Sequence, residues 1–183
     1  SIPLAGRHNV SNALAALAAG FVLGCTPQEM QAGLRTLTPT KMRYEVHEIG
    51  ARRFINDAYN ASPSSMRAAL ETTAALYHGR RIAVLGDMLE LGDAAEEAHR
   101  EIGRRAAELG FAALVTYGPQ AQWMHEAAEA AGCPVCRHAA THEAAAEHLR
   151  ALLRDGDTVL FKGSRGMKME AVIALLTGEE AGH

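Results

Sequence analysis

Residues 56–66 have the sequence NDAYNASPSSM, and the fold of the chain can be inferred outward from this stretch. It follows the short segment 53–55 and precedes an Ala-rich run. Ser62 is a favourable helix N-cap, and Pro63 suits the first helical turn because an N–H at that position has no helical partner. The stretch therefore predicts a strand, a polar turn and the start of a helix.

The turn carries side chains that suit a polar ligand. The carboxylate of Asp57, the phenol of Tyr59 and the amide of Asn60 come just before the predicted helix N-terminus. The free N–H groups of such a terminus favour anions. A well-capped turn without any ligand explains the same residues equally well, so both interpretations stay open on these grounds alone.

Size and composition limit the class of protein. A chain of 183 residues can bury one core with a small appendage, and 48% hydrophobic residues exclude a disordered chain. The net charge of −3 gives no reason to expect a nucleic-acid surface, and no apolar run reaches the roughly 18 residues of a membrane span. Three cysteines suggest a reducing cytoplasm. The sequence begins at Ser1, without an initiator Met, so we expect a piece of a longer protein.

Residues 1–40 predict two helices and a linker. Apolar or small residues recur at helical spacing between residues 9 and 23, with Asn9 as a candidate cap. Thr26-Pro27 predicts the start of a second, short helix. Residues 36–40, which include a proline, read as a linker. Two helices of this size cannot form a core by themselves.

Beyond residue 41, short apolar strands alternate with amphipathic helices. This pattern predicts an α/β fold, in which a Rossmann-like, mostly parallel sheet over residues 41–183 has helices on both faces. The predicted strands are 44–49 and 52–57, joined as a hairpin, then 82–85, 113–116, 135–137 and 158–161. The predicted helices are 64–77, 94–109, 120–131, 142–153 and 168–176.

Three polar loops follow predicted strands at 57–62, 86–92 and 162–166. Ligands of open α/β sheets bind at the carboxyl ends of the strands, so we expect these loops to meet there. The third loop, KGSRG, combines two cations, a hydroxyl and two glycines, which suits a carboxylate or phosphate. In the second loop, Asp87 and Glu90 could orient an ammonium group or could be a solvated pair, and His99 nearby is more often structural.

The stretch 57–66 closely resembles a signature of the Mur ligases, a family of peptidoglycan synthesis. The segments GRHNVSN (6–12), LGDMLELG (85–92) and FKGSRGM (161–167) agree with that family in kind and order, across nearly the whole chain. The resemblance implies that residues 1–40 end a central ATP-binding domain and that 41–183 form a C-terminal domain. No loop ending in Gly-Lys-Ser/Thr occurs in the chain, so the chain alone is expected to be inactive.

The resemblance also implies an activity, namely the ATP-dependent joining of D-alanyl-D-alanine to UDP-N-acetylmuramoyl-tripeptide through an acyl phosphate. ATP and Mg²⁺ would be held mainly by a missing domain, and a cytoplasmic monomer without nucleic-acid or membrane partners is expected. Implied nucleotide contacts are Asn9, Asn12, Arg43, Asp57, Tyr59 and Asn60. Implied substrate contacts are Asp87, Glu90, Lys162, Ser164 and Arg165. Arg43 and Lys162 are the expected catalytic residues.

Other interpretations compete with this one. The chain could be a stand-alone Rossmann-like module that binds a small ligand, or part of a related amide ligase such as one that extends folate with glutamate. Asn9 could equally be a helix cap, and Arg43 could equally be a charged residue of the linker. Cys133 and Cys136, with two histidines nearby, have the spacing of a compressed zinc site, but strand alternation tends to spread them over two faces. We therefore expect no metal site.

Overall fold

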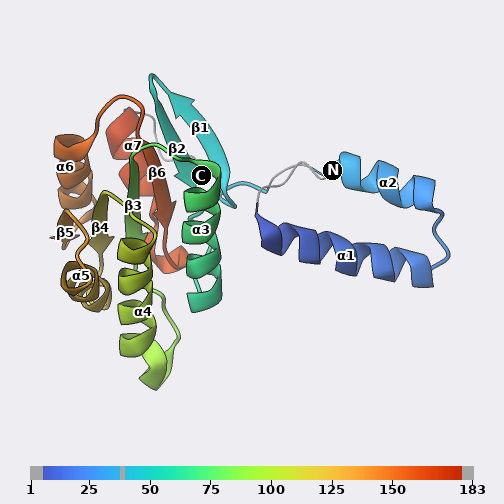
Figure 1. Cartoon of the computed structure of the whole chain (residues 1–183), viewed down its shortest axis with the longest axis horizontal. Coiled ribbons are helices and arrows are strands. Elements are labelled where there is room, and N and C mark those ends of the chain that lie inside the picture. The colour runs from blue at the N-terminus through green and yellow to red at the C-terminus, as the bar shows by residue number, and fades with distance from the viewer. Residues whose placement is uncertain (1–5, 38–39, 179–183) are drawn as a thin grey trace. The chain divides into compact units, whose positions relative to one another are not determined.

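A computed structural model describes residues 6–37 and 40–178 (Figure 1). The chain divides into two compact units, Ser1–Lys41 and Met42–His183. No helix in the described ranges is both long enough and apolar enough to cross a membrane.

The first unit consists of the helices α1 (Arg7–Val22) and α2 (Pro27–Arg35). α2 begins with a capping box in which Thr26 and Glu29 bond to each other's backbone N–H, as the Thr26-Pro27 sequence favours. α1 begins earlier than predicted, because Gly6 is its N-cap and Asn9 already lies in the first turn. The described side chains of this unit include none that is buried, so the unit has no core of its own.

The second unit is built on a six-stranded sheet with the order β1-β2-β6-β3-β4-β5. Its strands are β1 (Glu45–Ile49), β2 (Arg52–Asn56), β3 (Arg81–Gly86), β4 (Ala113–Tyr117), β5 (Cys136–Ala139) and β6 (Thr158–Lys162). β1 and β2 form an antiparallel hairpin, and every other pairing is parallel. The predicted mostly parallel sheet is therefore confirmed.

Helices cover both faces of this sheet (Figure 1). They are α3 (Pro63–Leu76), α4 (Ala95–Glu108), α5 (Ala121–Ala130), α6 (His142–Leu152) and α7 (Glu170–Thr177), with 3₁₀ turns η1 (Gly92–Ala94) and η2 (Arg165–Met167). One core joins α3, α4 and α5 to side chains such as Ile55 and Leu160. A second core joins α6 and α7 to their strand neighbours Phe54 and Val159. Successive strand residues thus face opposite layers, as the period of a strand requires.

The last helix begins later than predicted. Lys168, the expected first residue, has a left-handed backbone with φ 46°, and α7 starts only at Glu170. Likewise β5 is shifted from the predicted 135–137 to Cys136–Ala139. Both differences concern element ends, which local sequence determines weakly.

Close packing of α4 against α5 depends on Gly103. A Cβ at this position would lie 2.1 Å from the carbonyl oxygen of Met124, a backbone atom that cannot move aside alone. We expect Gly103→Ala to lower the free energy of unfolding by about 1–3 kcal/mol through overpacking, as measured in urea. Gly79→Ala is the matched control, because its Cβ would make only an ordinary contact at 3.7 Å. Equal losses in the two variants would contradict this explanation.

Candidate functional site

The three polar loops meet at the carboxyl edge of the sheet, because β2, β6 and β3 are neighbours there. Ser164 joins all three loops. Its hydroxyl accepts from the Leu89 N–H at 2.9 Å and donates to the Ala61 carbonyl at 3.4 Å, while its own N–H bonds to the Asp87 carbonyl. The side chain is 4% exposed, so these bonds are shielded from water. The prediction that the loops converge is confirmed.

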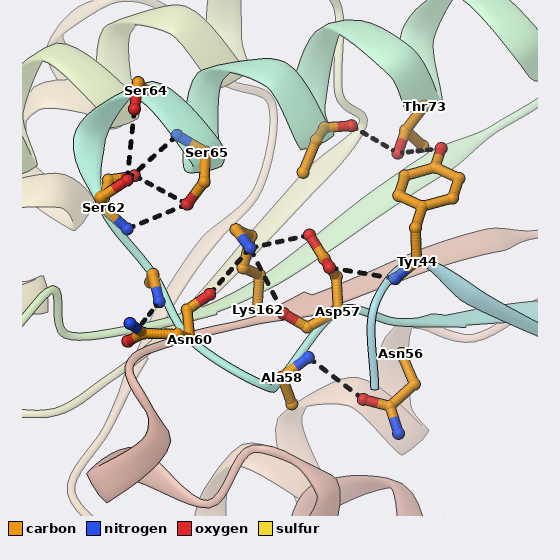
Figure 2. A network of polar contacts seen from close by, with 12 residues as sticks. Tyr44, Asn56, Asp57, Ala58, Asn60, Ser62, Ser64, Ser65, Thr73 and Lys162 are labelled. Atoms are coloured by element: carbon orange, nitrogen blue, oxygen red, sulfur yellow. Dashed lines mark hydrogen bonds and ion pairs between the residues drawn. The ribbon is translucent and has the colours of Figure 1, made fainter. Parts of the chain in front are cut away.

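Lys162, the last residue of β6, forms a buried ion pair with Asp57. Its Nζ lies 2.7 Å from Asp57 Oδ2 and donates to the Asn60 carbonyl at 2.9 Å (Figure 2). Only 4% of the lysine side chain is exposed. A buried ammonium is costly unless it is paired and hydrogen-bonded. The turn 57–60 supplies these partners, and the lysine in return holds the turn in position.

The second carboxylate oxygen of Asp57 bonds to the backbone just before β1, at the start of the second unit. Oδ1 accepts from the Tyr44 N–H at 3.0 Å, and Tyr44 has a left-handed backbone with φ 55°, which is uncommon for a residue with a large side chain (Figure 2). The Tyr44 hydroxyl lies 2.9 Å from Thr73 Oγ1 on α3, and burial raises the pKa of this phenol. Neither contact could be predicted from the local sequence, because Asp57 and Thr73 lie 13 and 29 residues from Tyr44.

The turn itself is stabilised by local hydrogen bonds. Asn60 Oδ1 accepts from the Ala61 N–H at 2.8 Å, and Asn56 Oδ1 accepts from the Ala58 N–H at 3.2 Å (Figure 2). Ser62 caps α3 through a reciprocal capping box with Ser65. The predicted strand, turn and capped helix are all present.

Arg43 and Tyr59 present exposed groups at this turn. The Arg43 guanidinium lies 4.1 Å from the centroid of the Tyr59 ring, and Tyr59 is 44% exposed. A cation stacked on an aromatic ring is a favourable arrangement, and both groups keep surface for a ligand. Of the expected nucleotide contacts in the second unit, Arg43, Tyr59 and Asn60 are exposed. The Asp57 carboxylate instead bonds to protein partners through both oxygens.

Asp87 anchors the start of α5. Its carboxylate is buried, and Oδ1 accepts from the Ala121 N–H at 2.6 Å. Burial raises the pKa of Asp87, although the N–H groups of Ala121 and Gln120 oppose that shift. The carboxylate of Asp87, which was expected to contact substrate, is therefore already hydrogen-bonded within the protein. Glu90 is exposed and has a left-handed φ of 64°.

His99 is a structural residue. Its Nε2 accepts from the Met88 N–H at 2.9 Å, which makes Nδ1 the donor to the Ala95 carbonyl at 2.7 Å. The ring is therefore neutral, fully buried, and ties the loop after β3 to α4. The expectation of a structural histidine agrees with these contacts.

Arg165 is the cation of the third loop that remains accessible. Its side chain is 53% exposed, pairs with Glu170 Oε1 on α7, and approaches the Met42 sulfur. Lys168 is also exposed, so one cation begins η2 and a second follows it directly. Carboxylates and phosphates are the groups that such cations bind.

Asn9 and Asn12 belong to the first unit. Asn12 Nδ2 donates to Asn9 Oδ1 at 3.4 Å, so the two amides share one face of α1, as their spacing predicts.

Within the described ranges, no group of three or more His, Cys, Asp or Glu side chains could hold a metal ion. A cavity of about 260 Å³ lies away from the loops, and it is lined by Ile49, Arg52, Phe54, Arg150, Leu153, Leu176 and Thr177.

Comparison with known proteins gives consistent matches. A family model described as "Mur ligase, glutamate ligase domain" matches residues 42–165. The UDP-N-acetylmuramoyl-tripeptide--D-alanyl-D-alanine ligases of Bacillus subtilis and Escherichia coli are 40% and 35% identical, over 94% and 96% of this chain. The chain spans 38% of the length of each of these relatives. A crystal structure of MurF from Acinetobacter baumannii matches with a TM-score of 0.87 and 34% identity, covering 97% of this chain and 39% of that one.

Loss of the buried cation should destabilise the second unit strongly. Lys162→Met leaves the Asp57 carboxylate, whose side chain is only 16% exposed, without its ion-pair partner. We expect the free energy of unfolding in urea to fall by about 3–5 kcal/mol. Lys168→Met, at an exposed lysine, should change it by less than about 0.5 kcal/mol. A similar small change in both variants would show that the buried pair contributes little.

Asp87 should make stability fall as the pH rises. Because burial raises its pKa, the folded state retains a proton that the unfolded state has already released. The stabilisation is complete below the unfolded pKa and is lost as the pH rises through the folded pKa. Asp87→Asn keeps an oxygen for the Ala121 N–H but does not titrate.

The measurement is the free energy of unfolding in urea between about pH 3 and pH 7. Wild type should lose more stability across this range than Asp87→Asn does. Asp93→Asn, at an exposed position, should keep the wild-type slope. Identical slopes for wild type and Asp87→Asn would refute the assignment.

Proposed function

This chain belongs to the Mur ligase family, and from that premise we propose that it acts as the C-terminal part of a ligase that joins D-alanyl-D-alanine to UDP-N-acetylmuramoyl-tripeptide. The observation that carries the proposal is the convergence of three loops on Ser164 and Lys162, with accessible cations at their rim. The activity for which the similar Bacillus subtilis and Escherichia coli ligases are named supports the choice of substrate. The setting would be the cytoplasm, and the ligase would act as a monomer.

The proposed reaction has two steps. A carboxylate oxygen of the tripeptide attacks the γ-phosphorus of ATP, the bond from that phosphorus to the bridging oxygen breaks, and ADP leaves, which gives an acyl phosphate. The amine of D-alanyl-D-alanine then attacks the acyl carbon, a C–N bond forms, and phosphate leaves with the former C–O bond electrons. The amine loses its extra proton to a base or to solvent.

The residues of this chain fit part of the nucleotide site. Arg43 and Tyr59 offer a cation and an aromatic face, which suit a phosphate and a base or sugar. Asn9 and Asn12 offer paired amides on α1. Magnesium, which neutralises phosphate charge in phosphoryl transfer, has no set of acidic ligands among the described residues. Another part of the ligase would therefore hold it.

The cations at η2 would bind the carboxylate of D-alanyl-D-alanine. Arg165 is half exposed, and its partner Glu170 is the first residue of α7. Lys162 would act as a positioning residue, because its ammonium is buried and already donates to the turn 57–60. Glu90, exposed on the second loop, is the candidate to orient the incoming amine.

The test compares the 183-residue chain with the full ligase that carries this sequence. The chain alone should neither ligate nor hydrolyse ATP in response to tripeptide, whereas the full ligase should consume ATP only when tripeptide and D-alanyl-D-alanine are both present. Extension of folate by glutamate would instead indicate a related amide ligase. Dipeptide binding without any ATP consumption would indicate a binding module.

Arg165→Ala in the full ligase should raise the KM for D-alanyl-D-alanine by about 10-fold to 100-fold, since a charged hydrogen bond contributes about 1.5–3 kcal/mol. The KM for ATP should stay the same. Arg104→Ala, at an α4 arginine paired with exposed Glu97, is the matched control and should leave both constants unchanged. An unchanged KM for the dipeptide in Arg165→Ala would refute the assigned role.

A further inference from the structure

His142 lies outside the three polar loops but bonds to η2, the turn that continues the third loop. It is the first residue of α6, and its Nε2 lies 2.7 Å from the Met167 carbonyl oxygen. Because a carbonyl oxygen only accepts, Nε2 carries the proton and donates. The His142 ring also lies against the Tyr117 ring, with the two centroids 4.4 Å apart. Tyr117 is the last residue of β4, so β4 and α6 together place this donor.

η2 requires support from outside the turn. Met167, its last residue, is followed by Lys168, which has a left-handed backbone with φ 46°. A residue with a side chain adopts this conformation at an energetic cost, so its surroundings must hold it there. The Met167 side chain is packed close to Gly86 and Gly118, where an added Cβ would lie 3.2 Å and 2.6 Å from it. The bond from His142 restrains the backbone of the same residue.

The position of Arg165 depends on this turn. Arg165 begins η2, and its carbonyl accepts from the Lys168 N–H at 3.2 Å, which closes the 3₁₀ turn around Met167. A shift of the Met167 carbonyl would therefore also move the Arg165 backbone. Among the described residues, the side-chain contacts of Arg165 both use Nη1, to Glu170 Oε1 and the Met42 sulfur. Its Nε and Nη2 form a free edge that can donate to both oxygens of a carboxylate.

We propose that His142 is a positioning residue for substrate binding. By holding the Met167 carbonyl, His142 keeps the free edge of Arg165 in place for the carboxylate of D-alanyl-D-alanine. The inference rests on the proposed function, from which it takes the dipeptide as the ligand of Arg165. His142 acts only through Arg165 and does not itself contact the dipeptide. A contact that merely stabilised the fold would not select one substrate, so the dependence on substrate separates the two roles.

The experiment measures KM values in the full ligase. His142→Ala should raise the KM for D-alanyl-D-alanine by about 3-fold to 10-fold, the factor that corresponds to one net hydrogen bond, and should leave the KM for ATP unchanged. His142→Gln presents an amide N–H at a similar reach, so most of the affinity should be restored. His148→Ala, at the other histidine of α6, is the matched control and should leave both constants unchanged.

A double variant tests the route through Arg165. Once Arg165→Ala has removed the guanidinium, adding His142→Ala should raise the KM for the dipeptide no further, because residues that act as a unit are not additive. Hydrogen exchange of the full ligase should be faster in the peptide that contains η2 in His142→Ala. Exchange in that peptide should stay close to wild type in His142→Gln.

Four outcomes would overturn the role of His142. They are an unchanged KM for the dipeptide in His142→Ala, equal rises in the KM values for dipeptide and ATP, equal rises in the Ala and Gln variants, and a fully additive loss in the double variant. A wild-type ligase that consumes no ATP with tripeptide and D-alanyl-D-alanine would refute the proposed function itself, and this role with it. An active wild type with any of the four outcomes would refute only the role of His142.

Discussion

The arrangement of the loops depends on one buried ion pair. The ammonium of Lys162 sits at the end of β6 with almost no access to water, and the carboxylate of Asp57 is its counter-charge. Neither charge is tolerable there alone, so the end of one strand and the turn after its neighbour must keep their relative positions. The hairpin, the capped helix α3 and the third loop are all attached to that pair.

Around this pair the polar groups divide into two sets. Ser164, His99 and Asp87 are buried, and their hydrogen bonds join loops or helices to one another. Arg43, Tyr59, Glu90 and Arg165 are exposed at the rim. The buried set gives the loops a fixed geometry, and the exposed set can contact a ligand without losing a partner that the fold requires. Rigid support beneath accessible groups is what a binding site needs.

The sequence predicts the fold well because the relevant signals are local. Ser62 and Pro63 mark the start of α3, and the strand and helix periods identify the α/β sheet, which also predicts where the loops meet. The roles of polar residues are harder to predict because their partners lie elsewhere. Nothing near Lys162 in the sequence distinguishes a buried cation from a solvated one, and the bond from Tyr44 to Asp57 joins residues thirteen apart. Asp87 resembles a ligand contact, yet it anchors a helix that begins thirty-four residues later.

The left-handed residues ahead of β1 have a consequence for anyone who divides this chain. Met42 and Tyr44 both have positive φ, and their backbone groups bond to the Tyr59 N–H and the Asp57 carboxylate. Residues 42–44 are therefore part of the turn that follows β2, although they precede the first strand. An expression boundary or a chimeric junction belongs before Met42. A graft that starts at Glu45 would lose the bonds from residues 42–44 to the turn that follows the first hairpin.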